Sequence, residues 1–398
     1  MISVSEAQSR LLDLVDPLSI EPTPLVSATG RFLAREIVSP INQPPFDASA
    51  MDGYAIQRSD LLPHAALDVV GSSVAGAPFS GQVRLGEAVR IFTGAKVPTG
   101  ADMVLIQESV SQDGDKITID AAEQSEDYIR VAGQDFMRGA KIAPGVALTP
   151  SRISQVAAMG FADVPCMRPV RIVILSTGDE LQTPGSPLND GEIYGSNGYG
   201  LRAALDGPIA EIQVLPIVPD QLNTLVEAFR MAMESDLIVT TGGASVGDHD
   251  LVMPAAKSLG LQAHFHKVRM RPGKPLMAGR FDDGPAFVGL PGNPVSALVC
   301  AEVFVRPIIR KMAGAQDVMP NMIKAKLSEA MPKNGPREHY MRAIFSVENG
   351  VISVAAFDRQ DSALTSVLAA ANCLVRRLPS APEAPAGTLV DILPLQNI

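Results

Sequence analysis

A short apolar run that breaks into a glycine-rich turn constrains the fold of this chain more than any other feature. Asp236 to Thr240 is apolar and rich in β-branched residues, which predicts a buried strand. Gly242, Gly243 and Gly247 follow it, and Leu251 to Leu259 has the character of a helix. Free amide groups and the helix dipole favour negative charge at a helix start. The strand, turn and helix therefore predict an anion site.

Side chains in this turn narrow the kind of anion that it could bind. Hydroxyls come from Thr240, Thr241 and Ser245, and carboxylates come from Asp248 and Asp250. The carboxylates would repel a bare anion, but a divalent cation can bridge them to phosphate-like oxygens. An ordinary strand-to-helix turn with Asp as the N-cap is the plainer alternative. Because glycines, hydroxyls and acids occur together, the sequence favours a ligand site.

Length and composition limit the class of protein. A chain of 398 residues is too long for one hydrophobic core, so two to four domains are expected. The net charge of -10 argues against a general binder of nucleic acid or membrane surfaces. The three cysteines are far apart, and the N-terminus lacks a basic-then-apolar signal segment. We therefore expect reduced thiols in a cytoplasmic protein.

Strands and helices alternate from Val170 to Met312. This alternation predicts a doubly wound, mostly parallel sheet with helices on both faces. Ligands of such sheets bind at the carboxyl ends of the strands. The polar residues that follow predicted strands are Glu180, Asp220, Asp250, Lys274 and the loop from Leu290 to Pro294. We therefore expect them to converge on one site.

Shorter elements flank this alternating region. A short helical segment is expected around Thr29 to Glu36. From Ala55 to about Asp135 the pattern is one of short strands and turns, and Asp113-Gly114 is typical of a hairpin turn. Beyond Gly314, a series of strands is predicted between Ile323 and Leu393. This series indicates a small β domain, either a barrel or a sandwich.

Three acids, Glu180, Asp220 and Asp250, come from three predicted strand ends. Carboxylates from separate loops commonly hold Mg²⁺ together with a phosphate, because Mg²⁺ prefers oxygen ligands and keeps several waters. Each acid also has a simpler explanation, since Asp220 could cap a helix and Glu180 could be merely solvated. Taken together, the three acids favour a magnesium site.

Two further loops have the character of anion sites. A basic run in this acidic protein consists of Lys267, Arg269, Arg271 and Lys274. A Pro-Gly turn between Arg271 and Lys274 places two cations on a stiffened loop that suits an oxyanion, although a solvated basic face is the usual alternative. The segment from Pro291 to Pro294 exposes amide groups at a helix start, and a plain N-cap would explain it equally well.

Six stretches together closely resemble the molybdopterin molybdotransferase family, whose animal relative is the E domain of gephyrin. They are Pro45 to Ala55, Phe92 to Glu108, Ser176 to Leu181, Thr241 to Asp250, Arg271 to Pro275 and Leu290 to Pro294. The resemblance covers nearly the whole chain. It implies insertion of molybdate into the dithiolene of molybdopterin, with hydrolysis of adenylylated molybdopterin, release of AMP and help from Mg²⁺.

The resemblance also implies an elongated protomer of four parts. Residues 1–45 and 136–168 would form an elongated N-terminal domain, 46–135 a small β domain, 169–314 the molybdopterin-binding α/β domain and 315–398 a small β-barrel domain. It further implies a homodimer whose active-site cleft is shared between subunits, with molybdopterin adenylyltransferase as the upstream partner. No nucleic-acid or membrane partner is expected.

Site residues follow from the resemblance position by position. Glu180, Asp220, Asp250 and Lys274 match active-site positions, the three acids as metal ligands. Asp52 and Thr93 match residues that reach the cleft of the partner subunit. Positions that match the binding loops are Gly242, Gly243, Ser245, Gly247, Pro291, Gly292, Asn293 and Pro294.

Two positions match the family less closely. Arg271 replaces the first lysine of the family's Lys-Pro-Gly-Lys motif, and its forked guanidinium has a different geometry from an ammonium group. Ser362 lies where the family often has a Gly-Ser segment. Both residues are expected to bind the cofactor substrate.

Two other functions stay open at the level of sequence. The region from Val170 to Met312 also resembles molybdopterin adenylyltransferase, which an ATP-dependent adenylylation assay would reveal. The other alternative is a non-catalytic scaffold like the gephyrin E domain, which would bind partner peptides and show no activity. Preference for tungstate over molybdate is a further alternative, because the two oxyanions are alike to such loops.

Overall fold

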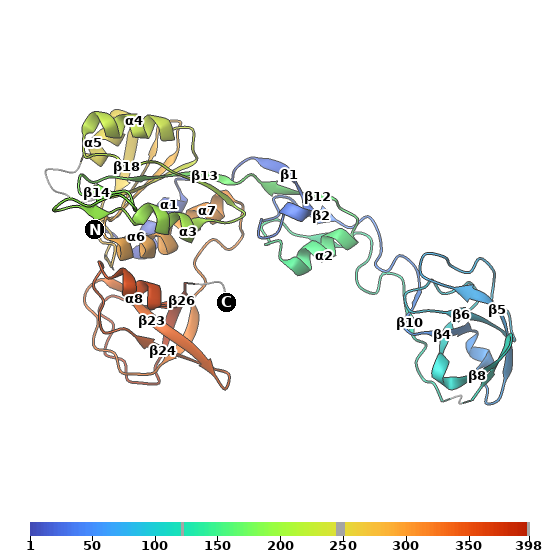
Figure 1. The fold of residues 1–398 in the computed structure, drawn as a ribbon. Helices are drawn as coiled ribbons and strands as arrows, with labels where there is room; N and C mark the ends of the chain where they lie inside the picture. The colour runs from blue at the N-terminus through green and yellow to red at the C-terminus, as the bar shows by residue number, and fades with distance from the viewer. Residues whose placement is uncertain (121–122, 244–250, 396–398) are drawn as a thin grey trace. The chain divides into compact units, whose positions relative to one another are not determined.

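The computed structural model describes residues 1–120, 123–243 and 251–395 (Figure 1). The chain forms two compact units. The first unit contains Met1–Arg35, Pro144–Thr149 and Val164–Ile398, and the second contains Glu36–Ala143 and Pro150–Asp163. Each unit has hydrophobic cores of its own.

A six-stranded mixed sheet lies at the centre of the first unit. Its strand order is β16 (Ala210–Val214), β13 (Val170–Ser176), β17 (Leu237–Thr241), β21 (Ala286–Leu290), β20 (Met277–Phe281) and β18 (Leu261–Phe265). The first four strands run parallel to one another, whereas β20 is antiparallel to both of its neighbours, β21 and β18. The predicted mostly parallel sheet is therefore confirmed, with β20 as a strand that the sequence analysis missed.

Both faces of this sheet are covered by helices, as a doubly wound fold requires (Figure 1). One face packs against α1 (Val4–Leu12), α3 (Asn197–Leu205), α6 (Pro294–Cys300) and α7 (Arg306–Met312), and the other against α4 (Leu222–Ala232) and α5 (Val252–Ser258). In β17, Leu237 and Val239 belong to one core, while Ile238 belongs to the other. Burial on both faces explains why these strands read as unbroken apolar runs.

The strands after residue 314 close into a five-stranded barrel. They are β22 (Ile323–Leu327), β23 (Glu338–Glu348), β24 (Val351–Ala356), β25 (Cys373–Arg377) and β26 (Leu389–Pro394). The ring closes because β23 pairs with both β24 and β25. The choice between barrel and sandwich is therefore settled in favour of the barrel. A short helix, α8 (Thr365–Ala370), precedes β25.

One strand connects the barrel to the α/β region by main-chain hydrogen bonds. The short strand β19 (Met270–Arg271) pairs in parallel with β23, with Met270 opposite Glu338. From β23, Tyr340 packs into the same core as the helices that cover the central sheet. The barrel, which has a core of its own, therefore also contributes to the core on one face of the central sheet.

The second unit is built on another six-stranded sheet. Its order is β7 (Met103–Ile106), β4 (Gly53–Ile56), β6 (Glu87–Ile91), β5 (Ala66–Ser73), β9 (Lys116–Ile119) and β8 (Val110–Asp113). The predicted hairpin at Asp113-Gly114 is confirmed between β8 and β9. The Arg90 guanidinium lies 5.1 Å from the ring centre of Tyr54 and 4.6 Å from that of Phe92.

The remaining elements are short. Two-stranded pairs form between β1 (Ile20–Pro24) and β12 (Asp163–Met167), β2 (Ile37–Val38) and β11 (Lys141–Ile142), β3 (Ala48–Ser49) and β10 (Ile129–Arg130), and β14 (Leu181–Gln182) and β15 (Ile193–Tyr194). A helix, α2, spans Pro150–Ala158, and single 3-10 turns lie at Leu25–Ser27, Arg58–Asp60 and Gln107–Ser109. A π-helical segment, Ala301–Val305, joins α6 to α7. Across the described ranges, no helix combines the length and the apolar character that crossing a bilayer requires.

The helix predicted around Thr29 to Glu36 is wrong. Phe32 and Leu33 instead form isolated bridges with Ala147 and Cys166. Pairing with residues more than a hundred positions away in the chain overrides the local helical preference, which is a weak bias on its own.

A buried histidine in the barrel makes the stability of the first unit depend on pH. His339 is 7% exposed, and its Nε2 has no hydrogen-bond partner in the described part of the chain. Burial, together with the positive charges of Arg271, Arg342 and Arg337, lowers the pKa of His339 to about 4. The unfolded chain binds a proton near pH 6.5, whereas the folded chain does not until about pH 4. Stability is therefore lost as pH falls through this window.

Replacing His339 by Gln should flatten this pH dependence. We expect the wild-type protein to lose on the order of 2 kcal/mol between pH 6.5 and pH 4 through this one group. Denaturant unfolding of both proteins across this range measures the difference, and the exposed His264 replaced by Gln provides a matched control. Parallel pH profiles for wild type and His339→Gln would contradict the assignment.

Candidate active site

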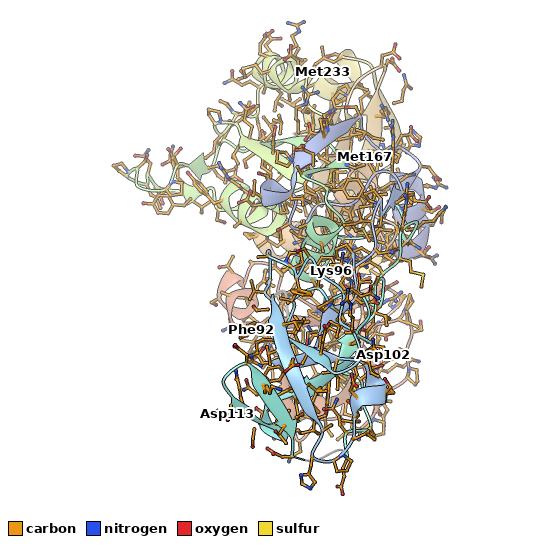
Figure 2. The ribbon with its side chains drawn as sticks, turned by 90° about the vertical axis from the view of Figure 1, so that its right-hand side faces the viewer. Phe92, Lys96, Asp102, Asp113, Met167 and Met233 are labelled. Carbon is orange, nitrogen blue, oxygen red and sulfur yellow. The ribbon has the colours of Figure 1, made fainter. Side chains whose placement is uncertain are left out.

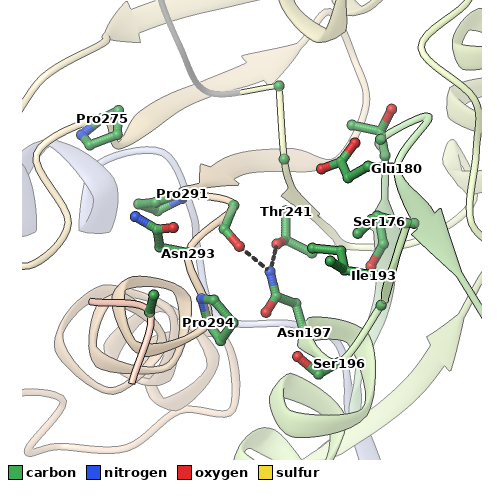
Figure 3. A pocket seen from close by; sticks show the side chains of 18 of the residues that line it. Ser176, Glu180, Ile193, Ser196, Asn197, Thr241, Pro275, Pro291, Asn293 and Pro294 are labelled. Atoms are coloured by element: carbon green, nitrogen blue, oxygen red, sulfur yellow. Dashed lines mark hydrogen bonds between the residues drawn. The ribbon is translucent and has the colours of Figure 1, made fainter. Parts of the chain in front are cut away.

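A cleft of about 720 Å³ lies in the first unit, where the parallel strands β13, β17 and β21 end (Figure 3). Loops that follow four strands form part of its wall. They contribute Thr177, Gly178, Glu180 and Leu181 after β13, Gly242 and Gly243 after β17, Lys274 and Pro275 after β19, and Pro291 to Pro294 after β21. The predicted convergence of strand ends is therefore present in the fold.

The turn after β17 requires glycine. Gly242 has a φ of 94°, and a Cβ there would lie 2.2 Å from the main-chain oxygen of Thr177. No other residue fits so close to the end of β13. Gly243 also lines the cleft. The predicted site residues Ser245, Gly247 and Asp250 lie outside the described residues.

An asparagine at the start of α3 joins two walls of the cleft. The Nδ2 of Asn197 donates to the Thr241 Oγ1 at 2.6 Å and to the Gly292 main-chain oxygen at 2.7 Å (Figure 3). Its Oδ1 is buried and has no partner among the residues described. Asn197 thus fixes the ends of β17 and β21 relative to each other. Asn197 is not among the site residues predicted from the sequence, because its partners Thr241 and Gly292 are distant along the chain.

Two of the three predicted acids line this cleft. The Asp220 Oδ1 accepts a hydrogen bond from the Thr177 hydroxyl, and its N–H donates to the Asp179 Oδ1 at 2.9 Å. Helix α4 has Gln221 at its N-cap and no side-chain cap, so the alternative that Asp220 caps this helix is wrong. Glu180 is exposed, and its main-chain oxygen accepts from the Ile193 N–H at 2.8 Å.

The described acids suit a hydrated Mg²⁺ better than a fully protein-bound metal. Glu180 and Asp220 offer hard carboxylate oxygens in one cleft. In the ranges that the structure describes, no cluster of three His, Cys, Asp or Glu could hold an ion. Mg²⁺ needs only one or two carboxylates when waters and substrate phosphates complete its shell. The donor set therefore fits the ion that the resemblance implies.

The basic run places two of its four cations in the cleft. Lys267 and Lys274 line it, and the Val268 N–H donates to the Lys274 main-chain oxygen at 3.0 Å. Gly273 has a φ of 105°, and a Cβ there would lie 2.3 Å from the Cys300 Sγ. Only glycine allows this tight turn. Lys267 belonged to the predicted basic run but had not been singled out as a site residue.

Arg271 takes a different position from the two lysines. It ends β19 and lies opposite His339 of the barrel, with an exposed side chain. Glu180 and Pro275, the neighbour of Lys274, lie on opposite sides of the cleft (Figure 3). Carboxylate-bearing and ammonium-bearing residues therefore line one cleft.

The start of α6 meets a loop from the barrel. Asn293 occupies the N-cap position but makes no side-chain cap; its Nδ2 donates to the Ser362 Oγ at 3.0 Å. The Val295 N–H donates to the Ser362 main-chain oxygen at 3.3 Å. Ala363 and the segment from Pro291 to Pro294 line the cleft. Asn293 is therefore not a plain N-cap, and Ser362 lies at the rim of the cleft.

Asp52 and Thr93 are paired with each other in the second unit. The Thr93 N–H and hydroxyl donate to the Asp52 Oδ1 at 2.7 and 2.8 Å. These hydrogen bonds from Thr93, aided by the charge of Arg90, hold the pKa of the Asp52 carboxyl below its ordinary value. The loop that carries Thr93 continues through Lys96 to Asp102 (Figure 2). Asp52 is therefore an ionised and oriented carboxylate.

Comparisons with known proteins agree along the whole chain. Three family models match: the MoeA N-terminal region (domain I and II) over residues 2–160, a probable molybdopterin binding domain over 173–311, and the MoeA C-terminal region (domain IV) over 324–395. A molybdopterin molybdenumtransferase of Haemophilus influenzae is 36% identical over 100% of both chains. One from Nostoc sp. is 35% identical over 88% of this chain and 84% of the relative.

A solved structure also matches the chain over nearly its whole length. The molybdopterin biosynthesis MoeA protein of Pyrococcus horikoshii is 27% identical, covers 99% of this chain and 100% of its own, and has a TM-score of 0.82. The fold, the cleft at the strand ends and the relatives at full length agree, and the chain belongs to the molybdopterin molybdenumtransferase (MoeA) family.

Proposed function

We propose that this protein inserts molybdate into the dithiolene of molybdopterin. Its substrate is adenylylated molybdopterin, whose phosphoanhydride is hydrolysed with release of AMP. The observation that carries the proposal is one cleft, at the ends of parallel strands, that combines the carboxylates of Glu180 and Asp220 with the ammonium groups of Lys267 and Lys274. Such a cleft suits a substrate that carries phosphates together with a metal oxyanion.

The residues act by positioning charge, and no covalent nucleophile is needed. Lys274 and Lys267, with the amide groups at the start of α6, bind oxyanions. Glu180, Asp220 and Asp250 would hold Mg²⁺, which would neutralise the charge on phosphate oxygens. Fixing two anions side by side replaces a reaction between free molecules by one within a complex.

The remaining predicted site residues bind the substrate around this centre. They are the loop residues Gly242, Gly243, Ser245 and Gly247, the segment Pro291, Gly292, Asn293 and Pro294, and the two residues Arg271 and Ser362. Asp52 and Thr93 complete the cleft of the partner subunit in a homodimer. The pairing of Asp52 with Thr93 supports this role, because it keeps a carboxylate ionised and fixed on an exposed loop.

We place the protein in the cytoplasm, downstream of a molybdopterin adenylyltransferase that supplies its substrate. The net charge of -10 argues against a general nucleic-acid binder. A tungstate substrate in place of molybdate is compatible with the same cleft.

Following AMP release from adenylylated molybdopterin tests the function directly. With Mg²⁺ present, we expect release that requires molybdate, because the oxyanion and the phosphoanhydride share one cleft. The control omits molybdate, and a parallel reaction contains tungstate. Two results would overturn the proposal in favour of an adenylyltransferase. One is AMP release that depends on neither molybdate nor tungstate, and the other is ATP-dependent adenylylation of molybdopterin. Absence of all release with a folded protein would favour a scaffold.

A further inference from the structure

A short apolar ribbon borders the cleft beside its charged residues. Its strands β14 and β15 pair in parallel, with Leu181 opposite Ile193 and Gln182 opposite Tyr194. Paired residues of a sheet point to the same face, and neighbours along a strand point to opposite faces. Leu181 and Ile193 therefore share one face of the ribbon, and both line the cleft. We call these two residues the apolar platform.

The platform is open to solvent at Ile193, which is 55% exposed. Among the described residues that line the cleft, Tyr194 is the other large apolar residue with an exposed side chain. Its hydroxyl donates to the Ser186 main-chain oxygen at 2.9 Å, which fixes the ring along the ribbon. Ile193 therefore offers its apolar surface to whatever occupies the cleft.

Hydrogen bonds hold the platform in place within the first unit. The Ile193 N–H donates to the Glu180 main-chain oxygen at 2.8 Å, and the Gly195 N–H donates to the Gln182 main-chain oxygen at 2.9 Å. The Leu181 N–H donates to the Gly178 main-chain oxygen at 3.1 Å. Ligand sites commonly combine preformed apolar walls with a few polar groups. An ordered apolar surface next to charged groups thus suits a flat ring that is attached to phosphates.

The place of the platform in the cleft indicates which ring it binds. Adenylylated molybdopterin has a pterin next to the dithiolene and an adenine on the far side of the phosphoanhydride. Ile193 lies on the side of Glu180, whereas Pro275 lies across the cleft (Figure 3). Because molybdate enters the dithiolene, the pterin end belongs at the oxyanion-binding loop of Lys274 and Pro275. The phosphates then lie near Glu180, and the adenine lies beyond them at the platform.

We propose that Leu181 and Ile193 bind the adenine ring of the substrate and so select for its nucleotide end. The faces of adenine are apolar, and contact with the two side chains removes apolar surface of both partners from water. This inference rests on the proposed function, which assigns the substrate and gives the oxyanion to the lysines. The released AMP contacts the same platform until it leaves.

Methyl NMR of the wild-type protein tests this contact directly. An aromatic ring stacked on the Ile193 Cδ1 methyl shifts its resonance upfield, so AMP should move this signal in a saturable way. Ribose 5-phosphate, which lacks the adenine, should not. The Ile344 methyl is the matched control, because Ile344 is 44% exposed on the barrel and does not line the cleft. Ile193→Val identifies the signal by its loss.

Three results of this titration would overturn the proposal. The first is an Ile193 signal that AMP does not shift upfield, and the second is an equal shift with ribose 5-phosphate. The third is an upfield shift with 6-hydroxymethylpterin but none with AMP, which would assign the platform to the pterin.

Calorimetric titration of a variant measures what the platform contributes to affinity. Ile193→Ser should raise the Kd for AMP by about tenfold, because a half-exposed isoleucine no longer covers the ring. The Kd values for ribose 5-phosphate and molybdate should stay unchanged. Tyr199→Ser is the matched control, since Tyr199 is 60% exposed on α3 and does not line the cleft. Equal losses for AMP and molybdate in Ile193→Ser would overturn the proposal.

Failure of this inference and failure of the proposed function give different results. Molybdate-dependent AMP release together with an unchanged Kd for AMP in Ile193→Ser would overturn the platform and leave the function standing. An AMP-induced shift of the Ile193 methyl without molybdate-dependent AMP release would support the platform and overturn the function.

Discussion

Replacing Asp220 by Asn should lower the rate of molybdate-dependent AMP release by about 100-fold or more, because a preorganised charge in a cleft contributes on that scale. The amide keeps the shape of the side chain and an oxygen that can accept from Thr177, but it loses the negative charge. Steady-state rates at several Mg²⁺ concentrations measure the effect, and the apparent affinity for Mg²⁺ should fall as well. Asp220 is chosen for this replacement because its hydrogen-bond partners, Thr177 and Asp179, are known.

Asp179→Asn is the matched control for this replacement. The Asp179 Oδ1 accepts from the Asp220 N–H at 2.9 Å, and Asp179 does not line the cleft. An amide oxygen accepts the same hydrogen bond, so we expect a rate close to wild type. Equal losses of rate in the Asp179 and Asp220 variants would show that a disturbed local fold lowers the rate, and that the missing charge in the cleft does not.

The largest expected effect on stability belongs to Asp236, at the opposite ends of the parallel strands. Its carboxylate accepts from the Arg168 Nη1 and Nη2 at 2.6 and 2.7 Å and from the Arg171 N–H at 2.9 Å. The side chain of Asp236 is 9% exposed and that of Arg168 is 27% exposed. Asp236→Ala would leave a half-buried guanidinium unpaired, which costs about 3 kcal/mol in the free energy of unfolding. Calorimetry of the first unit measures this loss.

The exposed pair between Arg230 and Glu227 provides a control, with side chains that are 58% and 64% exposed. Glu227→Ala should cost less than about 1 kcal/mol, because solvent screens such pairs. Similar losses in the free energy of unfolding for Asp236→Ala and Glu227→Ala would contradict the larger effect expected for Asp236.

The contribution of Asp236 also depends on pH. Burial alone would raise the pKa of Asp236, but hydrogen bonds from Arg168 and Arg171 and their charges outweigh burial, so the pKa lies below its ordinary value. The stabilisation is therefore present above pH 3.8, the ordinary value, and is lost as pH falls through the lowered pKa. Asp236→Ala should remove this acid-side dependence.

Strands buried on both faces could be predicted from the sequence almost residue by residue. The strand predicted at Asp236 to Thr240 is β17, Leu237–Thr241, because a strand covered on both faces is buried at every position. In contrast, the strand β20 was not predicted from the sequence, because a glycine such as Gly279 usually interrupts a strand. A Cβ at Gly279 would lie 2.4 Å from the Gln262 main-chain oxygen, so the glycine allows β20 to lie against β18.

The candidate site could be predicted only where side chains follow strands along the chain. Glu180, Asp220 and Lys274 do so, and the fold brings them to one cleft. Asn197 could not be found in this way, because its partners Thr241 and Gly292 are distant in sequence. The role of Asp220 stays a prediction that the Asp220→Asn variant will test.

The pairing of β19 with β23 limits how the protein can be truncated or divided into domains. Met270 and Arg271 lie within the α/β region of the chain but take their strand partner from the barrel. An artificial truncation after Gly314 would leave these two residues without that partner and open the core that Tyr340 fills. The barrel is therefore not an exchangeable module, and chimaeras that swap it between relatives will need the segment from Met270 to Lys274 to come from the same parent.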